Sequence, residues 1–122
     1  MNRILVIDQD RAAMEQLGLA CLAQGIGVAM ADNLCEGVRV LLGESVSLAL
    51  VDAAELRFGP RESATLFERV APDVPVVVMV RPEAELSRVV ALELAGFRVV
   101  TKPVTVSDLI AKVATERETK RG

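Results

Sequence analysis

The stretch Ser47 to Asp52, SLALVD, decides the fold of this chain. Leu48 to Val51 run without a polar residue, which is typical of a strand that is covered on both faces of a sheet. Asp52 follows at the point where such a strand leaves the core. The earlier apolar run Ile4 to Ile7 ends in the same way, on Asp8. Two buried strands that each stop at an aspartate predict an acidic pocket at the carboxyl ends of the strands.

The composition indicates one folded domain, because a chain of 122 residues can bury a sizeable core and 52% of its residues are hydrophobic. Only 2% are aromatic, so the core is expected to be aliphatic. The net charge is -3 and the sequence pI is about 5.0, whereas nucleic-acid-binding domains are typically basic. We therefore expect no nucleic acid to bind through this domain.

The chain contains no histidine, which excludes histidine-based catalysis, histidine metal ligation and a phosphohistidine carrier role. The two cysteines, Cys21 and Cys35, are isolated and lie in apolar helical patterns, so we interpret them as buried, reduced thiols of a cytoplasmic protein. The first apolar run is too short for a signal peptide, and no run approaches the roughly 18 apolar residues of a membrane span. No membrane contact is expected.

Strands and helices are expected to alternate along the chain. Three of the helices have capping residues at their start: Asp10 as an N-cap, and Asn33 with Glu36 and Thr105 with Asp108 as capping boxes. The expected strands are Ile4–Ile7, Ile26–Ala31, Ser47–Asp52, Val74–Val80 and Phe97–Thr101. The expected helices begin after Asp10, after Asn33, at Arg61, at Pro82 and after Thr105.

The apolar residues of each helix predict the face that it buries. The first helix is expected to bury Met14, Leu17 and Cys21; the second Leu34, Val38, Leu41 and Leu42; the third Leu66, Phe67 and Val70; and the last Leu109, Ile110 and Val113. The helix from Pro82, with Glu83 and Glu85 near its positive end, has more apolar residues than one face needs: Leu86, Val89, Val90, Leu92 and Leu94. The surplus is either core or a surface for a partner.

Five successive strand–helix units predict an α/β fold, a doubly wound parallel sheet with helices on both faces. Binding sites in such sheets lie at the carboxyl ends of the strands. The residues expected at those ends are Asp8 with Gln9, Asp52, Val80 with Arg81, and Lys102 with Pro103. The fold therefore predicts that two carboxylates and one lysine lie close together.

Four segments in this order resemble the receiver domain of two-component response regulators, the CheY-like family. They are ILVIDQD at residues 4–10, SLALVD at 47–52, PVVVMV at 75–80 and VVTKPV at 99–104. The resemblance assigns residues 1–115 to a receiver-like domain and leaves 116–122 as a charged tail or linker stub. It also implies the flavodoxin-like strand order 2-1-3-4-5.

The resemblance implies a chemistry for the predicted pocket. Asp52 would accept a phosphoryl group and Lys102 would pair with it. A magnesium ion would be held by Asp8, Asp52 and the backbone carbonyl of Ala54, and would offset negative charge on the nucleophile and the phosphoryl oxygens.

Three positions depart from the family pattern. The second acid of the pocket is replaced by Gln9, which brings no charge and should leave magnesium binding weak or absent unless Asp10 compensates. The hydroxyl that usually follows the fourth strand is replaced by Val80, and the aromatic switch residue of the fifth strand by Val99. The resemblance is therefore to an atypical receiver.

The expected function is that of a receiver domain in phosphorelay signalling, a non-enzymatic module that binds a partner signalling protein or a sensor histidine kinase, tuned by phosphorylation of Asp52. One alternative is a phosphorylation-independent module that dimerises through its fourth helix, fifth strand and fifth helix. A second is a phosphatase of the haloacid-dehalogenase type. Asp8-Gln9-Asp10 also resembles the motif of that family, with Asp8 as nucleophile and Asp10 as acid.

Overall fold

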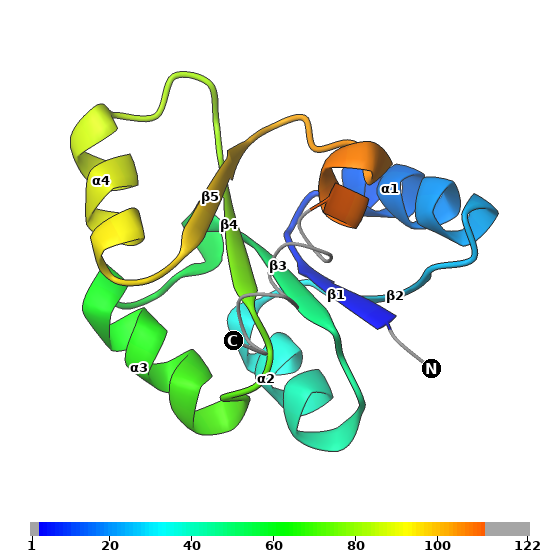
Figure 1. Ribbon diagram of the computed structural model, residues 1–122, viewed down its shortest axis with the longest axis horizontal. Helices are drawn as coiled ribbons and strands as arrows, with labels where there is room; N and C mark the ends of the chain where they lie inside the picture. Colours follow the sequence, from blue (N-terminus) through cyan, green and yellow to red (C-terminus); the bar gives the residue numbers. More distant parts are fainter. Residues whose placement is uncertain (1–2, 112–122) are drawn as a thin grey trace.

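The computed structural model describes residues 3–111 and contains five parallel strands in the order β2-β1-β3-β4-β5 (Figure 1). The elements are β1 (Arg3–Ile7), α1 (Arg11–Ala23), β2 (Gly27–Ala31), α2 (Leu34–Gly43), β3 (Leu48–Asp52), the 3-10 turn η1 (Ala53–Glu55), α3 (Pro60–Val70), β4 (Val76–Val80), α4 (Leu86–Leu94) and β5 (Arg98–Thr101). A last helix begins at Val106. The predicted fold class and strand order are confirmed; Val113 and the tail lie outside the described residues.

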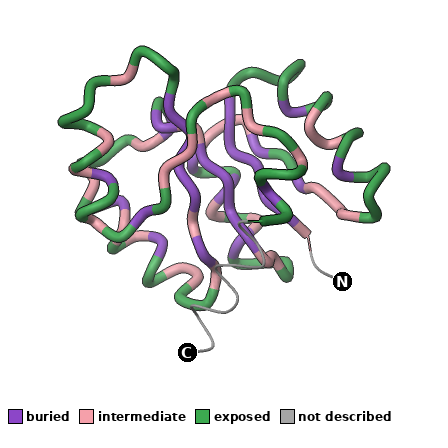
Figure 2. Tube along the Cα trace, turned by 45° about the horizontal axis from the view of Figure 1, so that its top comes forward, coloured by how far each residue is buried: buried purple, intermediate pink, exposed green. Residues whose placement is uncertain are grey.

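The sheet divides the core into two apolar layers because successive strand residues point to opposite faces. One layer lies under α2, α3 and α4 and includes Leu5, Ile7, Val51, Val78 and Val80. The other lies under α1 and the last helix and includes Ile4, Val6, Leu50, Val77 and Met79. Figure 2 shows the three central strands, β1, β3 and β4, mostly buried, with exposed residues on the outer sides of the helices. The expected helices on both faces are therefore present.

Side chains at the start of α1 and of the last helix satisfy backbone amides as predicted. The Asp10 carboxylate accepts a hydrogen bond from the Ala13 amide at 3.1 Å. Thr105 Oγ1 accepts from the Asp108 amide at 3.2 Å, and the Asp108 carboxylate accepts from the Thr105 amide at 3.3 Å. This reciprocal pair is a complete capping box.

Helix α2 departs from the sequence prediction in two side chains. Its cap is present, since Asn33 accepts from the Glu36 amide at 3.0 Å. Leu42, however, is 69% exposed and does not belong to the buried stripe. Cys35 is also exposed, whereas Cys21 is buried as expected. Both exposed residues lie on the side of a ten-residue helix that faces away from the sheet, and a short helix buries only a narrow face.

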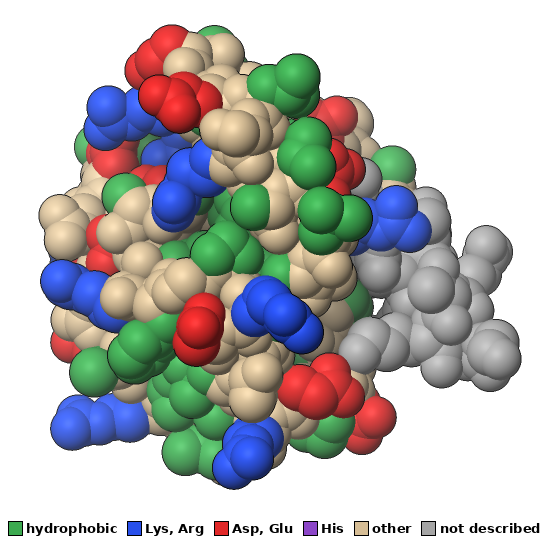
Figure 3. All heavy atoms as spheres, turned by 90° about the vertical axis from the view of Figure 1, so that its left-hand side faces the viewer, with side chains coloured by type: hydrophobic (Ala, Val, Ile, Leu, Met, Phe, Trp, Pro, Cys, Tyr) green, Lys and Arg blue, Asp and Glu red, His purple; other side chains and the backbone are tan. Residues whose placement is uncertain are grey.

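Helix α4 begins later than predicted. Pro82 and Glu83 lie in a turn, and the helix starts at Leu86 after Glu85. Of the surplus apolar residues of this helix, some belong to the core and others lie on the surface, so each of the two interpretations holds for part of the set. Leu92 is fully buried, whereas three side chains are exposed on the surface: Leu86, Val90 and Leu94. Figure 3 shows hydrophobic side chains among charged ones on the face of the molecule that carries α4 and α3.

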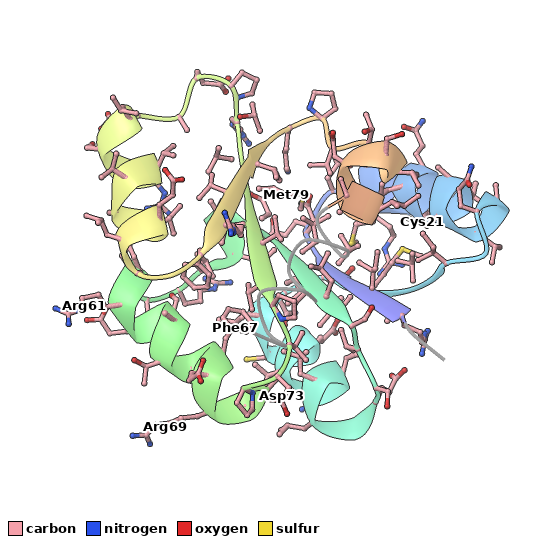
Figure 4. All side chains as sticks on the ribbon, viewed as in Figure 1. Cys21, Arg61, Phe67, Arg69, Asp73 and Met79 are labelled. Atoms are coloured by element: carbon pink, nitrogen blue, oxygen red, sulfur yellow. The ribbon has the colours of Figure 1, made fainter. Side chains whose placement is uncertain are left out.

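Helix α3 is amphipathic, with Phe67 inward. Figure 4 shows Phe67 pointing from α3 toward the sheet, while Arg61 and Arg69 of the same helix point away from it. The Phe67 ring meets the Phe97 ring edge to face, with 6.1 Å between the ring centroids. These two of the three aromatic residues of the chain therefore fix α3 against the segment that leads into β5.

Gly37 lets α2 lie directly on β1. A Cβ atom at this position would lie 2.2 Å from Ile7 Cδ1, and Ile7 is fully buried. We expect Gly37→Ala to lower the free energy of unfolding by about 1–3 kcal/mol through overpacking, although alanine favours helices. The measurement is urea unfolding followed by circular dichroism.

Gly43 in the same helix is the matched control, because no atom of the described chain lies within 4 Å of the corresponding Cβ position. Gly43→Ala should leave stability unchanged or raise it by up to about 1 kcal/mol. Adding Ile7→Val, which removes Cδ1, should recover part of the loss caused by Gly37→Ala. Equal stability of the two alanine variants would contradict the close approach of α2 to Ile7.

Candidate functional site

The two predicted carboxylates lie side by side at the carboxyl ends of β1 and β3. These strands pair in parallel with Ile7 opposite Val51, so Asp8 and Asp52 follow neighbouring positions. Their side chains are 5% and 17% exposed. The Asp52 carboxylate also accepts a hydrogen bond from the Ala54 amide at 3.1 Å, which fixes its orientation at the start of η1.

Lys102 joins the two carboxylates. Its Nζ donates to Asp8 Oδ2 at 3.0 Å and to Asp52 Oδ2 at 2.9 Å, and its side chain is 26% exposed. Its backbone amide donates to the Val80 carbonyl at 2.8 Å, and the Lys102–Pro103 peptide bond is cis. The structure therefore brings the three predicted residues together from β1, β3 and the end of β5.

This arrangement favours the ionised forms of Asp52 and Lys102. Burial alone would raise the pKa of Asp52, but hydrogen bonds from Lys102 and from the Ala54 amide bring that pKa below its usual value. Burial alone would lower the pKa of Lys102, and the hydrogen bonds to Asp52 and Asp8 raise it instead. At neutral pH Asp52 is thus an ionised carboxylate with nucleophilic oxygens, held against a protonated amine.

Asp10 and Gln9 take different positions in the pocket. Asp10 Oδ1 accepts a hydrogen bond from the Ala13 amide in α1, and the backbone amide of Asp10 donates to Asp8 Oδ1 at 3.0 Å. Asp10 is therefore the N-cap of α1, as predicted. The Gln9 side chain lies in the solvent-exposed part of the loop after β1.

The two switch positions carry apolar side chains in apolar surroundings. Val80 is the last residue of β4, is 5% exposed and packs in the layer beneath α2, α3 and α4. Val99 is half-buried on β5, opposite Val78, and packs against the same layer. Neither side chain can donate a hydrogen bond toward Asp52.

Glu55 is a member of the pocket that sequence reasoning missed. The segment after Asp52 forms the short 3-10 turn η1, for which Asp52 is the N-cap and Glu55 the last residue. Glu55 is only 2% exposed, and its Oε1 has no hydrogen-bond partner among residues 3–111. Burial first, then the negative charges of Asp52 and Asp8, raise the pKa of Glu55, while contacts with Arg57 and Gln9 lower it.

A second missed contact connects α4 to the same turn. Arg88 Nη2 donates to the Ala53 carbonyl at 3.2 Å. Ala53 directly follows Asp52, so this bond joins the fourth helix to the turn that orients the carboxylate. The three-residue spacing from Asp52 to Glu55 could have indicated Glu55 in the sequence, whereas no local pattern indicates Arg88.

The pocket has the donor chemistry of a hard divalent cation, although its side chains do not form a ready-made cage. Within residues 3–111, no three His, Cys, Asp or Glu side chains are grouped so that they could hold a metal ion. The available donors are nevertheless all oxygens: the carboxylates of Asp8 and Asp52, the Ala54 carbonyl and the unpartnered Oε1 of Glu55. Oxygen ligands of this kind are the type that magnesium prefers.

Comparisons with known proteins agree with this geometry. No protein-family model matches the chain. It is 32% identical over 104 residues to the transcriptional regulatory protein GlrR of Escherichia coli (strain K12), which covers 83% of this chain and 23% of GlrR. It is 26% identical over 119 residues to the response regulator MprA of Mycobacterium avium (strain 104), covering 97% of this chain and 52% of MprA. The chain thus spans about half of MprA and less than a quarter of GlrR.

Solved structures share the fold over nearly the whole chain. A CheY-like receiver domain from Methanospirillum hungatei JF-1 has a TM-score of 0.81 at 24% identity, and the match covers 99% of this chain and 97% of that one. The chain is a receiver domain of the response-regulator type. A response regulator from Burkholderia pseudomallei, solved with a phosphorylated aspartic acid, a calcium ion and citrate, has a TM-score of 0.79 at 20% identity, covering 100% of this receiver domain and 74% of that chain.

We predict that Lys102→Met destabilises the receiver domain most at neutral pH. Because the folded-state pKa of Asp52 is lowered, the stability from its pairing is present above the usual aspartate pKa and is lost as the pH falls through the lowered value. The raised pKa of Lys102 has the opposite pH dependence. The stability that the charged lysine contributes is lost only as the pH rises through that raised pKa, far above neutral. The pair is mostly buried, so we expect a loss of about 1–3 kcal/mol at pH near 7.

Urea unfolding of both proteins at about pH 7 and about pH 3 measures this difference, because aspartates are largely protonated at the lower value. The gap between native protein and Lys102→Met should shrink at the acidic pH. The matched control is Arg69→Met, which removes a cation from the exposed side of α3, away from the carboxylates. A gap of the same size at both pH values would contradict the assigned pairing.

Proposed function

We propose that this receiver domain takes a phosphoryl group on Asp52 and uses it to adjust contact with a partner protein. The observation that carries the proposal is the bond of Lys102 to both Asp52 and Asp8. A buried nucleophilic carboxylate next to a protonated amine is the arrangement that an attack on a phosphoryl group requires.

The proposed reaction is a transfer between two molecules. An Asp52 oxygen attacks the phosphorus, its new bond gives an acyl phosphate, and the bond from phosphorus to the leaving group breaks with its electron pair on that group. Lys102 remains protonated and exchanges one carboxylate contact for a phosphoryl oxygen. The proposed donor is the phosphohistidine of a sensor kinase or a small acyl phosphate, because these 122 residues contain no histidine.

Magnesium is the proposed cofactor, with Asp8, Asp52 and the Ala54 carbonyl as its holders. When bound, the ion supplies positive charge that offsets the charge of the carboxylates and the phosphoryl oxygens. Gln9 contributes an amide where the family pattern has a carboxylate, so this residue lowers the affinity for the ion.

We propose that this domain transmits the signal without the hydroxyl and the aromatic switch residue of the family pattern. Val80 offers no hydroxyl to a phosphate on Asp52, and Val99 has no ring that could change position. The contact of Arg88 with the Ala53 carbonyl supports a different link, from the turn after Asp52 to α4. The exposed apolar residues of α4, with Ile110 of the last helix, are the surface we propose for a partner protein or a second copy.

The first experiment is the intact mass of the protein after incubation with acetyl phosphate and magnesium. We expect one phosphoryl adduct on the native protein and none on Asp52→Asn. Asp8→Asn tests the phosphatase alternative. Turnover through Asp8 would release phosphate without a stable adduct on Asp52, and Asp8→Asn would abolish that release. No adduct on native protein, with correct folding, would exclude phosphorylation by small donors and favour a phosphorylation-independent module.

A second prediction concerns the replaced positions. Gln9→Asp together with Val80→Thr should raise magnesium affinity and strengthen the conformational response to phosphorylation, since the pair restores a carboxylate and a hydroxyl. Calorimetry with magnesium and amide chemical shifts on phosphorylation measure the two effects. The control is Val80→Thr alone, which should leave magnesium affinity unchanged. If the double variant bound magnesium no more tightly than native protein, the account of Gln9 would be wrong.

A further inference from the structure

One peptide unit in the turn after β3 is hydrogen-bonded at both ends. The Ala54 amide donates to Asp52 Oδ1 at 3.1 Å, and the carbonyl of the same unit, that of Ala53, accepts from Arg88 Nη2 at 3.2 Å. The Leu56 amide also donates to this carbonyl, at 3.2 Å. The unit is trans, so it is planar and its N–H and C=O point in opposite directions. The Asp52 carboxylate and the Arg88 guanidinium are therefore joined through one rigid plane.

The charge on Arg88 acts on Asp52 through this peptide unit. A cation beside the carbonyl draws electron density toward the oxygen, and the amide becomes a stronger donor because hydrogen bonds in a chain polarise one another. A hydrogen bond in which one partner is ionised is also stronger than one between neutral groups, and here both the donor at one end and the acceptor at the other are ionised. The plane cannot turn without weakening one of these bonds, so Arg88 fixes the direction in which the Asp52 oxygen is held.

Arg88 belongs to the helix that follows the replaced switch position. Asp52 pairs with Met79 in the sheet, so Ala53 and Val80 are the next residues of the two neighbouring segments. The Val80 side chain has no hydrogen-bond donor. Arg88 lies in the first turn of α4, and its side chain reaches back to the Ala53 carbonyl. The segment after β4 therefore provides a guanidinium beside Asp52, at the residue next to it, where the family pattern provides a hydroxyl.

We propose that Arg88 is a positioning residue for Asp52, which holds the carboxylate through the Ala53–Ala54 peptide and links its phosphorylation state to α4. When Asp52 carries a phosphoryl group, the Ala54 amide exchanges the carboxylate oxygen for a phosphoryl oxygen, the peptide plane turns, and its carbonyl moves relative to Arg88. The inference deepens the proposed function, because the link to α4 rests on phosphorylation of Asp52. The positioning itself belongs to the unphosphorylated domain and can be measured without a phosphoryl donor.

The experiment follows backbone amides by nuclear magnetic resonance in four proteins: native, Arg88→Met, Arg88→Lys and Arg61→Met. Methionine keeps an apolar stem without the donors, whereas lysine keeps a cation. Arg61→Met is the matched control, because it removes the same charge from the exposed side of α3. Circular dichroism melts verify that each variant is folded. The same proteins are then incubated with acetyl phosphate and magnesium, and intact mass against time gives the rate of Asp52 phosphorylation.

We expect Arg88→Met to shift the Ala54 amide resonance before phosphorylation, to slow phosphorylation about 3- to 10-fold and to lose the shifts of α4 amides that phosphorylation causes in native protein. Arg88→Lys should restore part of each effect, and Arg61→Met should behave like native protein. Folded Arg88→Met with the native Ala54 resonance and the native rate would overturn the inference. Native α4 shifts in that variant would overturn the link to α4. If native protein formed no adduct, the proposed phosphorylation would be wrong, and the Ala54 resonance would still decide whether Arg88 positions Asp52.

Discussion

The site depends on one interaction, the bond of a single ammonium group to two buried carboxylates. Asp8 and Asp52 end adjacent parallel strands, so the sheet itself forces two negative charges into contact at low exposure. Without Lys102 those charges would repel each other or be neutralised by protonation. The lysine can reach both because it directly follows β5, which ends at the same edge of the parallel sheet as β1 and β3. Parallel topology therefore brings together residues 94 positions apart.

The sequence predicted the features that depend on periodicity and on strand ends. Continuous apolar runs such as Leu48 to Val51 identify strands that are covered on both faces. In a parallel sheet, an aspartate or lysine that follows such a strand must lie at the edge where the carboxyl ends of the strands meet. The helix caps could also be predicted, because Asp10 and Thr105 each accept a hydrogen bond from an amide only three residues further along the chain. Each of these inferences uses local geometry that the chain fixes by itself.

The features that could not be predicted depend on packing between distant segments. Glu55 is polar, and it is buried in the 3-10 turn that follows the carboxyl end of β3. Leu42 is apolar, but the face of α2 that packs on Ile7 through Gly37 does not include it. The start of α4 was misplaced because Pro82 suits both a first helical turn and the turn that the structure has there. The contact of Arg88 with the Ala53 carbonyl has no sequence signature at all.

These same contacts limit how a charge change at Asp52 could act on the rest of the domain. A ligand or modification can shift a conformational equilibrium only by the difference in its interaction energy with the two states. Val80 and Val99 pack in an apolar layer and have no polar group to exchange, so they provide little of that difference. Lys102 and the η1 turn are polar, partly accessible and bonded to Asp52 or to its neighbours. A response to phosphorylation in this domain would therefore begin with rearrangement of Lys102 and the turn, and the bond from Arg88 to the Ala53 carbonyl links that turn to α4.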